Sequence, residues 1–105
     1  MAYRVVWTDS ASSALSEIAA YLEREAPGHV STVVREILDI ATSLDELPFR
    51  GRIVPELKRQ DTRELFIYSY RLIYRVSETS VYVMSVFHGR RRLTSEMVDG
   101  RQEEE

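Results

Sequence analysis

The sequence predicts an α+β domain with the element order strand, helix, helix and then three strands. Two changes in pattern support this prediction. Apolar residues recur every three or four positions between residues 11 and 44, and they alternate every second position between residues 63 and 87. Short turns separate the later segments, so neighbouring strands are expected to run antiparallel. The chain has 105 residues and no cysteine, and a single domain of this size can bury a sufficient core without disulfides.

The first half of the chain is expected to form a strand followed by a helical hairpin. Residues 3–7 are mainly β-branched and aromatic, which favours a strand. Residues 8–10 (Thr-Asp-Ser) are good N-cap residues directly before the first helical pattern. Pro27 ends that pattern, and a second apolar stripe begins at residue 30. The short break between the stripes predicts two antiparallel helices.

The second half is expected to form an antiparallel meander from residues 63–68, 70–76 and 81–87. In its middle strand Arg71 and Arg75 share one face with Ile73, because successive side chains point to opposite sides. We expect the helices to cover the other, apolar face. The arginine face is then left to solvent or to a partner.

Charge is divided sharply along the chain. Residues 1–49 hold three basic and eight acidic residues, residues 50–92 hold ten and four, and residues 93–105 hold one and five. The basic segment can attract phosphates or an acidic partner, or it can be a solvated sheet face. We predict one domain over residues 1–92 and an acidic, partly disordered tail over residues 93–105.

Several classes of protein are excluded or disfavoured by motif. The sequence has no Gly-rich phosphate loop, no HExxH and no GxSxG. Two histidines without cysteine disfavour a transition-metal site, and we expect neither metal nor cofactor. The N-terminus lacks the apolar region of a signal peptide, and no apolar run approaches the roughly 20 residues that span a bilayer. We therefore expect a cytoplasmic protein.

The main candidate site is a cationic cluster, which comprises Arg71, Arg75, His88, Arg90, Arg91 and Arg92. If the last two strands pair, Arg71 is expected close to His88 and Arg90. Guanidinium groups bind phosphate in bidentate fashion, and a histidine can act as a general base near neutral pH. In the alternative interpretation His88 caps a strand and the arginines pair with Glu56, Glu64 or Glu78.

A second candidate site lies on the helical hairpin, where the edges of the apolar stripes carry Ala20, Tyr21, Val33 and Ile40. These side chains could form a groove for a partner helix. They could equally be the margin of the core.

An ordered set of motifs extends over residues 3–92. It comprises Trp7-Thr8-Asp9-Ser10-Ala11, Leu15-x-x-Ile18-x-x-Tyr21-Leu22, Leu47-Pro48-x-x-Gly51-Arg52, Arg63-Glu64-Leu65, Tyr70-Arg71-Leu72-Ile73-Tyr74-Arg75-Val76 and His88-Gly89-Arg90-Arg91. The set resembles the RelE/ParE toxins of bacterial type II toxin–antitoxin (plasmid stabilisation) modules. The resemblance implies an antiparallel sheet carrying a helical hairpin, and a cognate ParD-like or similar antitoxin that wraps both. The residues expected to contact it are Leu15, Ile18, Tyr21, Leu22, Val33, Ile37 and Ile40.

The family that the chain resembles divides by target. RelE-like members cut mRNA in the ribosomal A site with lysines, arginines and a C-terminal tyrosine. Here the lysine positions fall near Thr62 and Glu64, and the tyrosine position falls near Met97. The ParE-like branch includes inhibitors of DNA gyrase, and the strand end His-Gly-Arg-Arg is similar to that branch.

We therefore predict a ParE-like toxin that acts by binding gyrase or a similar target through the cationic cluster, and not by cleavage. One alternative is a ribosome-dependent mRNA endonuclease, whose catalytic residues would be Arg71, His88, Arg90, Arg91 and Glu64. Another is an inert plasmid-stabilisation remnant that still binds its antitoxin. Glu64 and Met97 favour the binding toxin over the nuclease.

Overall fold

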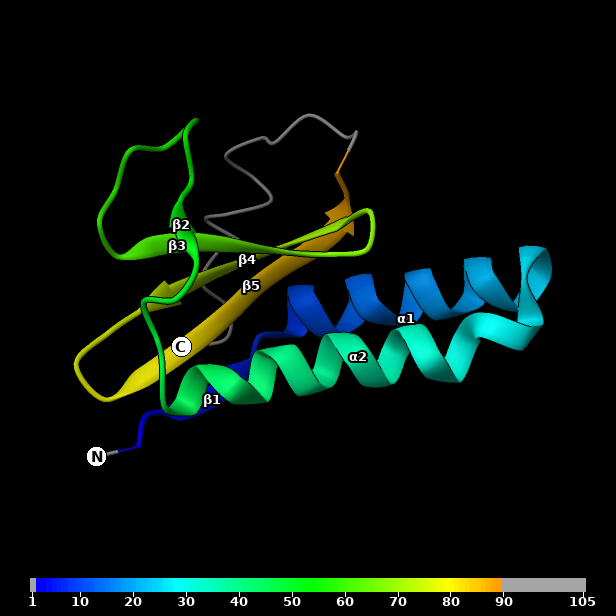
Figure 1. The fold of residues 1–105 in the computed structure, drawn as a ribbon, viewed down its shortest axis with the longest axis horizontal. Helices are drawn as coiled ribbons and strands as arrows, with labels where there is room; N and C mark the ends of the chain where they lie inside the picture. The colour runs from blue at the N-terminus through cyan, green and yellow to red at the C-terminus, as the bar shows by residue number, and fades with distance from the viewer. Residues whose placement is uncertain (1, 90–105) are drawn as a thin grey trace.

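The computed structural model describes residues 2–89 and shows a helical hairpin packed on one face of a sheet (Figure 1). Its elements are β1 (Arg4–Trp7), α1 (Asp9–Glu25), α2 (Val30–Thr42), β2 (Arg52–Ile53), β3 (Thr62–Ile67), β4 (Tyr70–Val76) and β5 (Ser80–His88). Short 3-10 turns follow the helices at Pro27–His29 and Ser43–Asp45. The predicted α+β fold is confirmed, and the two-residue strand β2 is an addition to the predicted order.

The sheet has the strand order β1-β5-β4-β3-β2. Strands β2 to β5 pair antiparallel, which confirms the meander. Strand β1 lies beside β5 and parallel to it, so the first strand pairs with the last. The helical hairpin carries the chain from β1 at one edge of the sheet to β2 at the other edge.

Helix α1 begins at Asp9 because Thr8 caps it. The Thr8 hydroxyl accepts a hydrogen bond from the Ala11 amide at 3.1 Å and donates one to the carbonyl of Val83 in β5 at 2.8 Å. The residue is completely buried. One side chain thus satisfies a free amide of the helix and joins the helix start to the sheet.

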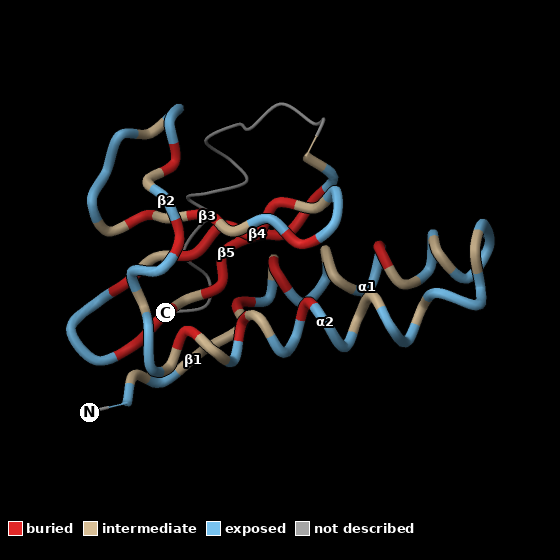
Figure 2. The backbone as a smooth tube through the Cα atoms, in the orientation of Figure 1, coloured by how far each residue is buried: buried red, intermediate tan, exposed pale blue. Residues whose placement is uncertain are grey.

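The main core lies between the helices and the sheet (Figure 2). Its buried members include Ala11 and Ile37 from the helices and Leu72, Tyr74 and Val83 from the sheet. The opposite face, called the outer face below, carries a second apolar cluster of buried residues: Val54, Ile73, Met84 and Phe87. Val54 and the adjoining Leu57 belong to the loop of residues 54–61, so this loop covers part of the outer face.

A β-bulge in β5 changes which residues face the helices. Ile73 pairs with Ser85 and Tyr74 pairs with Val83, so Met84 is the extra residue of the bulge. Without a bulge, strict alternation would put Val83 and Val86 on opposite faces. In the structure both belong to the main core. After the bulge, the alternation of side chains between the two faces of the sheet is therefore shifted by one residue relative to the beginning of β5.

Candidate functional site

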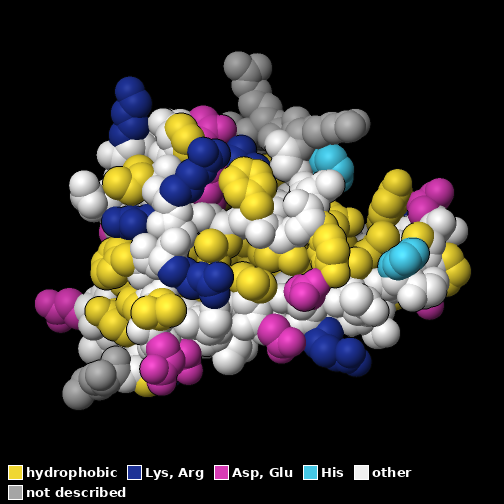
Figure 3. Space-filling model, in the orientation of Figure 1, with side chains coloured by type: hydrophobic (Ala, Val, Ile, Leu, Met, Phe, Trp, Pro, Cys, Tyr) yellow, Lys and Arg dark blue, Asp and Glu magenta, His cyan; other side chains and the backbone are white. Residues whose placement is uncertain are grey.

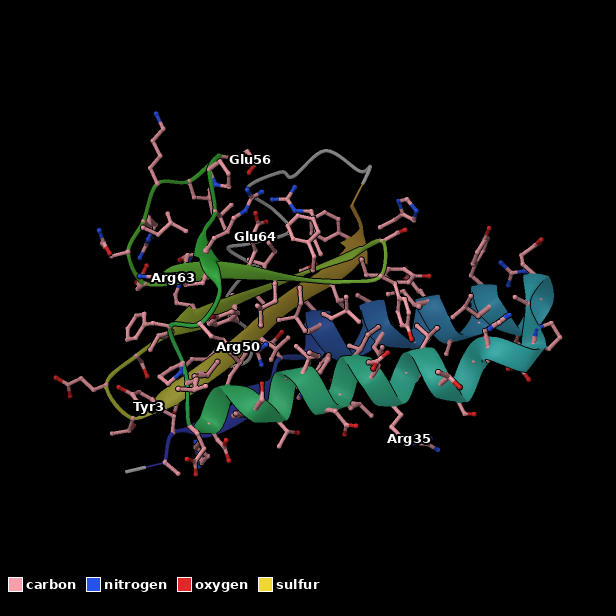
Figure 4. The ribbon with its side chains drawn as sticks, in the orientation of Figure 1. Tyr3, Arg35, Arg50, Glu56, Arg63 and Glu64 are labelled. Atoms are coloured by element: carbon pink, nitrogen blue, oxygen red, sulfur yellow. The ribbon has the colours of Figure 1, made fainter. Side chains whose placement is uncertain are left out.

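Arg71 lies on the outer face and is bound by two carboxylates. Its Nε donates to Glu64 Oε1 at 2.8 Å, and its Nη2 also contacts that oxygen. Its Nη1 and Nη2 reach the two oxygens of Glu56 at 3.3 and 3.2 Å. Glu64 lies on β3 and Glu56 on the loop above it (Figure 4). Arg71 thus ties β4 to β3 and to the 54–61 loop.

The other oxygen of Glu64 is held by Arg52, whose Nε lies 2.5 Å from Oε2. The Glu64 side chain has no exposed surface, whereas that of Arg52 is 60% exposed. Burial alone would lower the pKa of Arg71, but its bonds to Glu56 and Glu64 leave that pKa raised. The bond from Arg71 lowers the pKa of Glu56. Arg71 and Glu56 therefore stay charged near neutral pH. The cluster joins two guanidinium groups to two carboxyl groups, so its formal charges sum to zero.

Two phenylalanine rings flank these guanidinium groups. The Arg71 guanidinium carbon lies 5.9 Å from the centroid of Phe66 and 5.5 Å from that of Phe87, and that of Arg52 lies 5.4 Å from Phe66. Such contacts favour a cation over the ring face. Phe66 remains half exposed. This charged and aromatic group, Arg52, Glu56, Glu64, Phe66, Arg71 and Phe87, is called the outer-face cluster below.

The expectation that the arginine face is open is wrong for Arg71, which is only 7% exposed. The pairing with Glu56 and Glu64 that the sequence left as an alternative is the one observed. The expected approach of His88 to Arg71 is also wrong. His88 pairs with Tyr70 and their rings lie 5.9 Å apart, whereas Arg71 pairs with Phe87. Neighbouring residues of a strand face opposite sides, so His88 lies on the helix side of the sheet.

The remaining cations of the predicted cluster are separate from Arg71 or lie beyond the described part. Arg75 is half-buried and donates from Nε to the Thr62 hydroxyl at 3.2 Å. It lies on the outer face four residues from Arg71, about 13 Å along the strand. Arg90, Arg91 and Arg92 lie outside the described residues, as does Met97.

A groove of about 320 Å³ lies between α1 and the end of the sheet. It is lined by Ala14, Glu17, Ile18, Tyr21, Tyr70, Val86, Phe87 and His88. Figure 3 shows hydrophobic side chains in a band between the sheet and the helices. The groove therefore combines an apolar floor with polar groups at Glu17, His88 and the tyrosines, as in sites that bind an amphipathic segment.

The residues predicted to bind an antitoxin divide into three groups. Ile18 and Tyr21 line the groove, and Tyr21 is 53% exposed. Leu15, Leu22, Val33 and Ile40 are partly buried against the main core. Ile37 has no exposed surface. Its assignment to a contact surface is wrong because its side chain is one of the core residues that join α2 to the sheet.

Sequence reasoning missed the sheet wall of the groove, which includes Tyr70, Val86 and His88. The bulge at Met84 turns Val86 and His88 toward α1, and nothing in the local pattern marks it. Glu17 was missed on the helix side, although its position one turn before Tyr21 could have indicated it.

The described part of the chain, residues 2–89, contains no group of three or more His, Asp or Glu placed to hold a metal ion. None of its helices is long and apolar enough to cross a membrane.

Comparison with known proteins gives the class of this domain. The fold is similar to the chromosomal ParDE toxin–antitoxin system of P. aeruginosa, with a TM-score of 0.70 and 17% identity over 82% of this chain and 95% of the other. It is also similar to E. coli toxin RelE, as a mutant in the free state, with a TM-score of 0.66 and 23% identity over 96% and 98% of the chains. The complex RelBE2 of Mycobacterium tuberculosis matches with a TM-score of 0.59 and 22% identity over 84% and 92%. The domain therefore has the RelE/ParE toxin fold.

Sequence comparison gives the family. A family model described as the ParE toxin of the type II toxin–antitoxin system parDE matches residues 5–93. The curated protein "Putative toxin Y4kP" of Sinorhizobium fredii (strain NBRC 101917 / NGR234) is 34% identical over 87 residues, which are 81% of this chain and 86% of that protein. The chain belongs to the ParE toxin family of type II toxin–antitoxin systems.

Proposed function

We propose that this toxin acts in the cytoplasm by binding DNA gyrase or a similar target, without cleaving RNA, and that a cognate antitoxin neutralises it. The observation that supports this proposal is the burial of Arg71 between two carboxylates. A toxin that cleaves RNA needs accessible cations to stabilise the charge that develops on the phosphate. In this protein Glu56 and Glu64 already neutralise Arg71, the candidate cation on the outer face.

The positions of the candidate proton-transfer groups also support a toxin that does not cleave RNA. A general base must come within hydrogen-bond reach of the hydroxyl that it deprotonates. Glu64 has no exposed side-chain surface, and both of its oxygens are held by guanidinium groups. His88 lies on the opposite face of the sheet from Glu64 and Arg71. The nuclease set Arg71, His88 and Glu64 is thus not assembled on one surface.

Target contacts are proposed for Arg75, His88 and the basic run of residues 90–92. Arg71 is proposed to act from within, by holding β3, β4 and the 54–61 loop in place. Loss of toxicity on mutation of Arg71 therefore has to be corrected for the amount of folded protein.

The antitoxin is proposed to place an apolar helix in the groove between α1 and the sheet. Two of the similar structures are a ParDE toxin–antitoxin system and the toxin–antitoxin complex RelBE2. The groove has the size and the apolar floor that an inserted side chain requires. Ile18 and Tyr21 are the predicted contact residues that line it.

Two replacements test the groove. Ala14→Trp fills it from α1, while Ser16→Trp adds the same side chain to an exposed position of α1 outside the groove. We expect the Ala14 variant to remain toxic when it is co-expressed with the cognate antitoxin, and the Ser16 variant to be neutralised. If the antitoxin neutralised both variants, the groove would not be its binding site.

The target is tested with purified toxin in two assays. We expect inhibition of plasmid supercoiling by gyrase and intact mRNA on programmed ribosomes. In cells, induction without antitoxin should give filaments and DNA-damage signalling before translation stops. Cleavage of A-site codons would establish the nuclease alternative instead, and normal growth with soluble, folded toxin would indicate the inert remnant.

A further inference from the structure

The segment that joins α2 to β2 contains a turn whose apolar side chains face solvent. Leu47 is 62% exposed and Phe49 is 49% exposed. The Arg50 amide closes the turn by donating to the Leu47 carbonyl at 3.2 Å, and Pro48 stands at the second position, where its fixed φ suits a turn. Single exposed apolar side chains are common on protein surfaces. Two of them on one closed turn form a small apolar patch of the kind that marks a contact site.

The turn is held firmly on both sides. Leu44, which precedes it, is fully buried in the main core. Gly51, which directly follows it, is buried and donates from its amide to the Tyr74 hydroxyl at 2.9 Å. A surface that already has its bound shape loses little conformational entropy when a partner binds. The turn is therefore preorganised for contact, although its side chains are exposed.

Arg63 of β3 joins the turn to the sheet. Its Nη1 donates to the carbonyl oxygens of Phe49 at 3.2 Å and Gly51 at 3.0 Å, and its Nε donates to that of Gln60 at 3.0 Å. Its guanidinium carbon lies 4.9 Å from the centroid of the Phe49 ring. This contact favours one position of the ring against the cation, while about half of Phe49 stays in solvent.

Two cations beside the turn have no carboxylate partner among residues 2–89. Arg63 is bonded to backbone carbonyl oxygens, and Arg50 donates to the Ser43 hydroxyl at 2.6 Å. The ion pairs of this part of the chain involve other arginines, and Glu46, which precedes the turn, pairs with neither. Both arginines lie beside the segment that joins α2 to β2 (Figure 4). Their unpaired positive charge attracts acidic groups.

The composition of this surface favours a protein as its partner. An apolar centre with charged groups at its rim is typical of protein–protein contacts. Nucleic acid is held mainly through its phosphates, so it would use the two cations and leave Leu47 in water. A protein that carries an apolar side chain next to carboxylates would satisfy both parts of the surface.

We propose that Leu47, Phe49, Arg50 and Arg63, called the turn patch below, bind the target protein through an apolar side chain that is flanked by carboxylates on that target. This role rests on the proposed function, in which a protein is bound and no RNA is cleaved, and it adds a contact surface to the basic residues proposed there. No residue of the turn patch lines the antitoxin groove. Antitoxin binding is therefore an independent check that a variant is folded.

The test compares two replacements of Leu47 that carry opposite charges. Leu47→Asp places an acid where carboxylates of the target are expected, whereas Leu47→Lys adds a cation on an apolar stem. We expect Leu47→Asp to raise the toxin concentration that half-inhibits gyrase at least about tenfold, and Leu47→Lys no more than about threefold. Leu38→Asp is the matched control, because Leu38 is also an exposed leucine, at 40%, but belongs to α2. It should leave inhibition unchanged.

A second pair of variants tests the charge. Arg50→Gln should weaken inhibition several-fold and make it less sensitive to salt, because a cation of the contact surface is lost. Arg35→Gln removes an exposed cation of α2 that lies away from the turn (Figure 4), and it should change neither property. All variants should bind the antitoxin as the wild type does and melt within about 3 °C of it, since the replaced side chains are exposed.

Growth arrest on induction is measured for the same variants, because it reports toxicity whichever protein is the target. We expect Leu47→Asp to lose it and Leu38→Asp to keep it. Equal toxicity of the wild type and Leu47→Asp would overturn the turn patch, as would equal losses from Leu47→Asp and Leu47→Lys. Failure of the proposed function would appear in the wild type itself, as unaffected supercoiling or cleaved mRNA. A wild type that neither inhibits gyrase nor arrests growth would overturn both.

Discussion

Replacement of Arg71 by methionine is expected to destabilise the fold strongly. Methionine keeps much of the apolar length of the side chain between Phe66 and Phe87, so the change removes mainly the charge and its hydrogen bonds. Glu64 would then be left fully buried with only Arg52 as a partner. An acid whose cation has been removed keeps its desolvation penalty and loses most of its compensation.

The magnitude follows from the burial of the pair. Breaking a buried ion pair from one side costs about 3–5 kcal/mol. Arg52 still holds one oxygen of Glu64, so we expect a value near the lower limit, about 3 kcal/mol. For a domain of this size that corresponds to a fall in melting temperature of roughly 12 °C or more.

A double replacement separates the ion pair from simple loss of packing. Glu64→Leu combined with Arg71→Met removes both buried charges and leaves Arg52 and Glu56, which are both substantially exposed. Apolar replacement of a whole buried pair is often neutral or stabilising. We therefore expect the double variant to recover most of the stability that the single variant loses.

Urea unfolding followed by Trp7 fluorescence and far-UV circular dichroism measures these free energies. The matched control is Arg59→Met, whose partner Asp61 lies at 3.0 Å with both side chains about half exposed, and which should cost less than about 1 kcal/mol. The reasoning is refuted if Arg71→Met costs no more than this control. It is also refuted if the double variant is less stable than the single one.

Three further predictions concern other contacts. Gly51→Ala should cost about 1–3 kcal/mol in thermal unfolding, because a Cβ there would lie 2.6 Å from the Glu64 carbonyl oxygen and 2.7 Å from the Tyr74 hydroxyl. Thr8→Val should cost about 2 kcal/mol in urea unfolding, because it removes the helix cap and the bond to β5; no measurable change would contradict this role. The bond from Arg71 lowers the pKa of Glu56 from its ordinary value of 4.5. The Glu56 carboxylate therefore stabilises the fold at pH values above 4.5, and this stabilisation is lost as the pH falls through the lowered pKa. Between about pH 7 and about pH 3 the wild type should lose up to about 1 kcal/mol more than Glu56→Gln, measured by melting temperature, and parallel curves would contradict this.

The elements of this fold could be predicted because each has a local cause. The three- and four-residue spacing of apolar residues gave both helices, and the cap residues before Asp9 gave the start of the first one. The alternation of residues 70–76 and the short turns gave the meander. The family resemblance rested on the same residues, and comparison with known proteins confirms it.

The arrangement of the candidate sites could not be predicted, because it depends on pairings between distant residues. The parallel contact of β1 with β5 joins residues more than 70 positions apart. The bulge at Met84 reverses the facing of the last residues of β5 and moves His88 to the groove. The expectation that His88 lies close to Arg71 rested on the pairing of the last two strands, which does not reveal a bulge.

The sequence by itself determined the order of helices and strands, the basic middle of the chain and the toxin family, since periodicity, composition and motif order are properties of neighbouring residues. Only the tertiary structure decided that Arg71 is a buried, neutralised cation and not an exposed one. The reason is physical: a guanidinium enters the interior when carboxylates meet it there, and Glu56 and Glu64 meet Arg71 only after the loop and β3 have folded against β4.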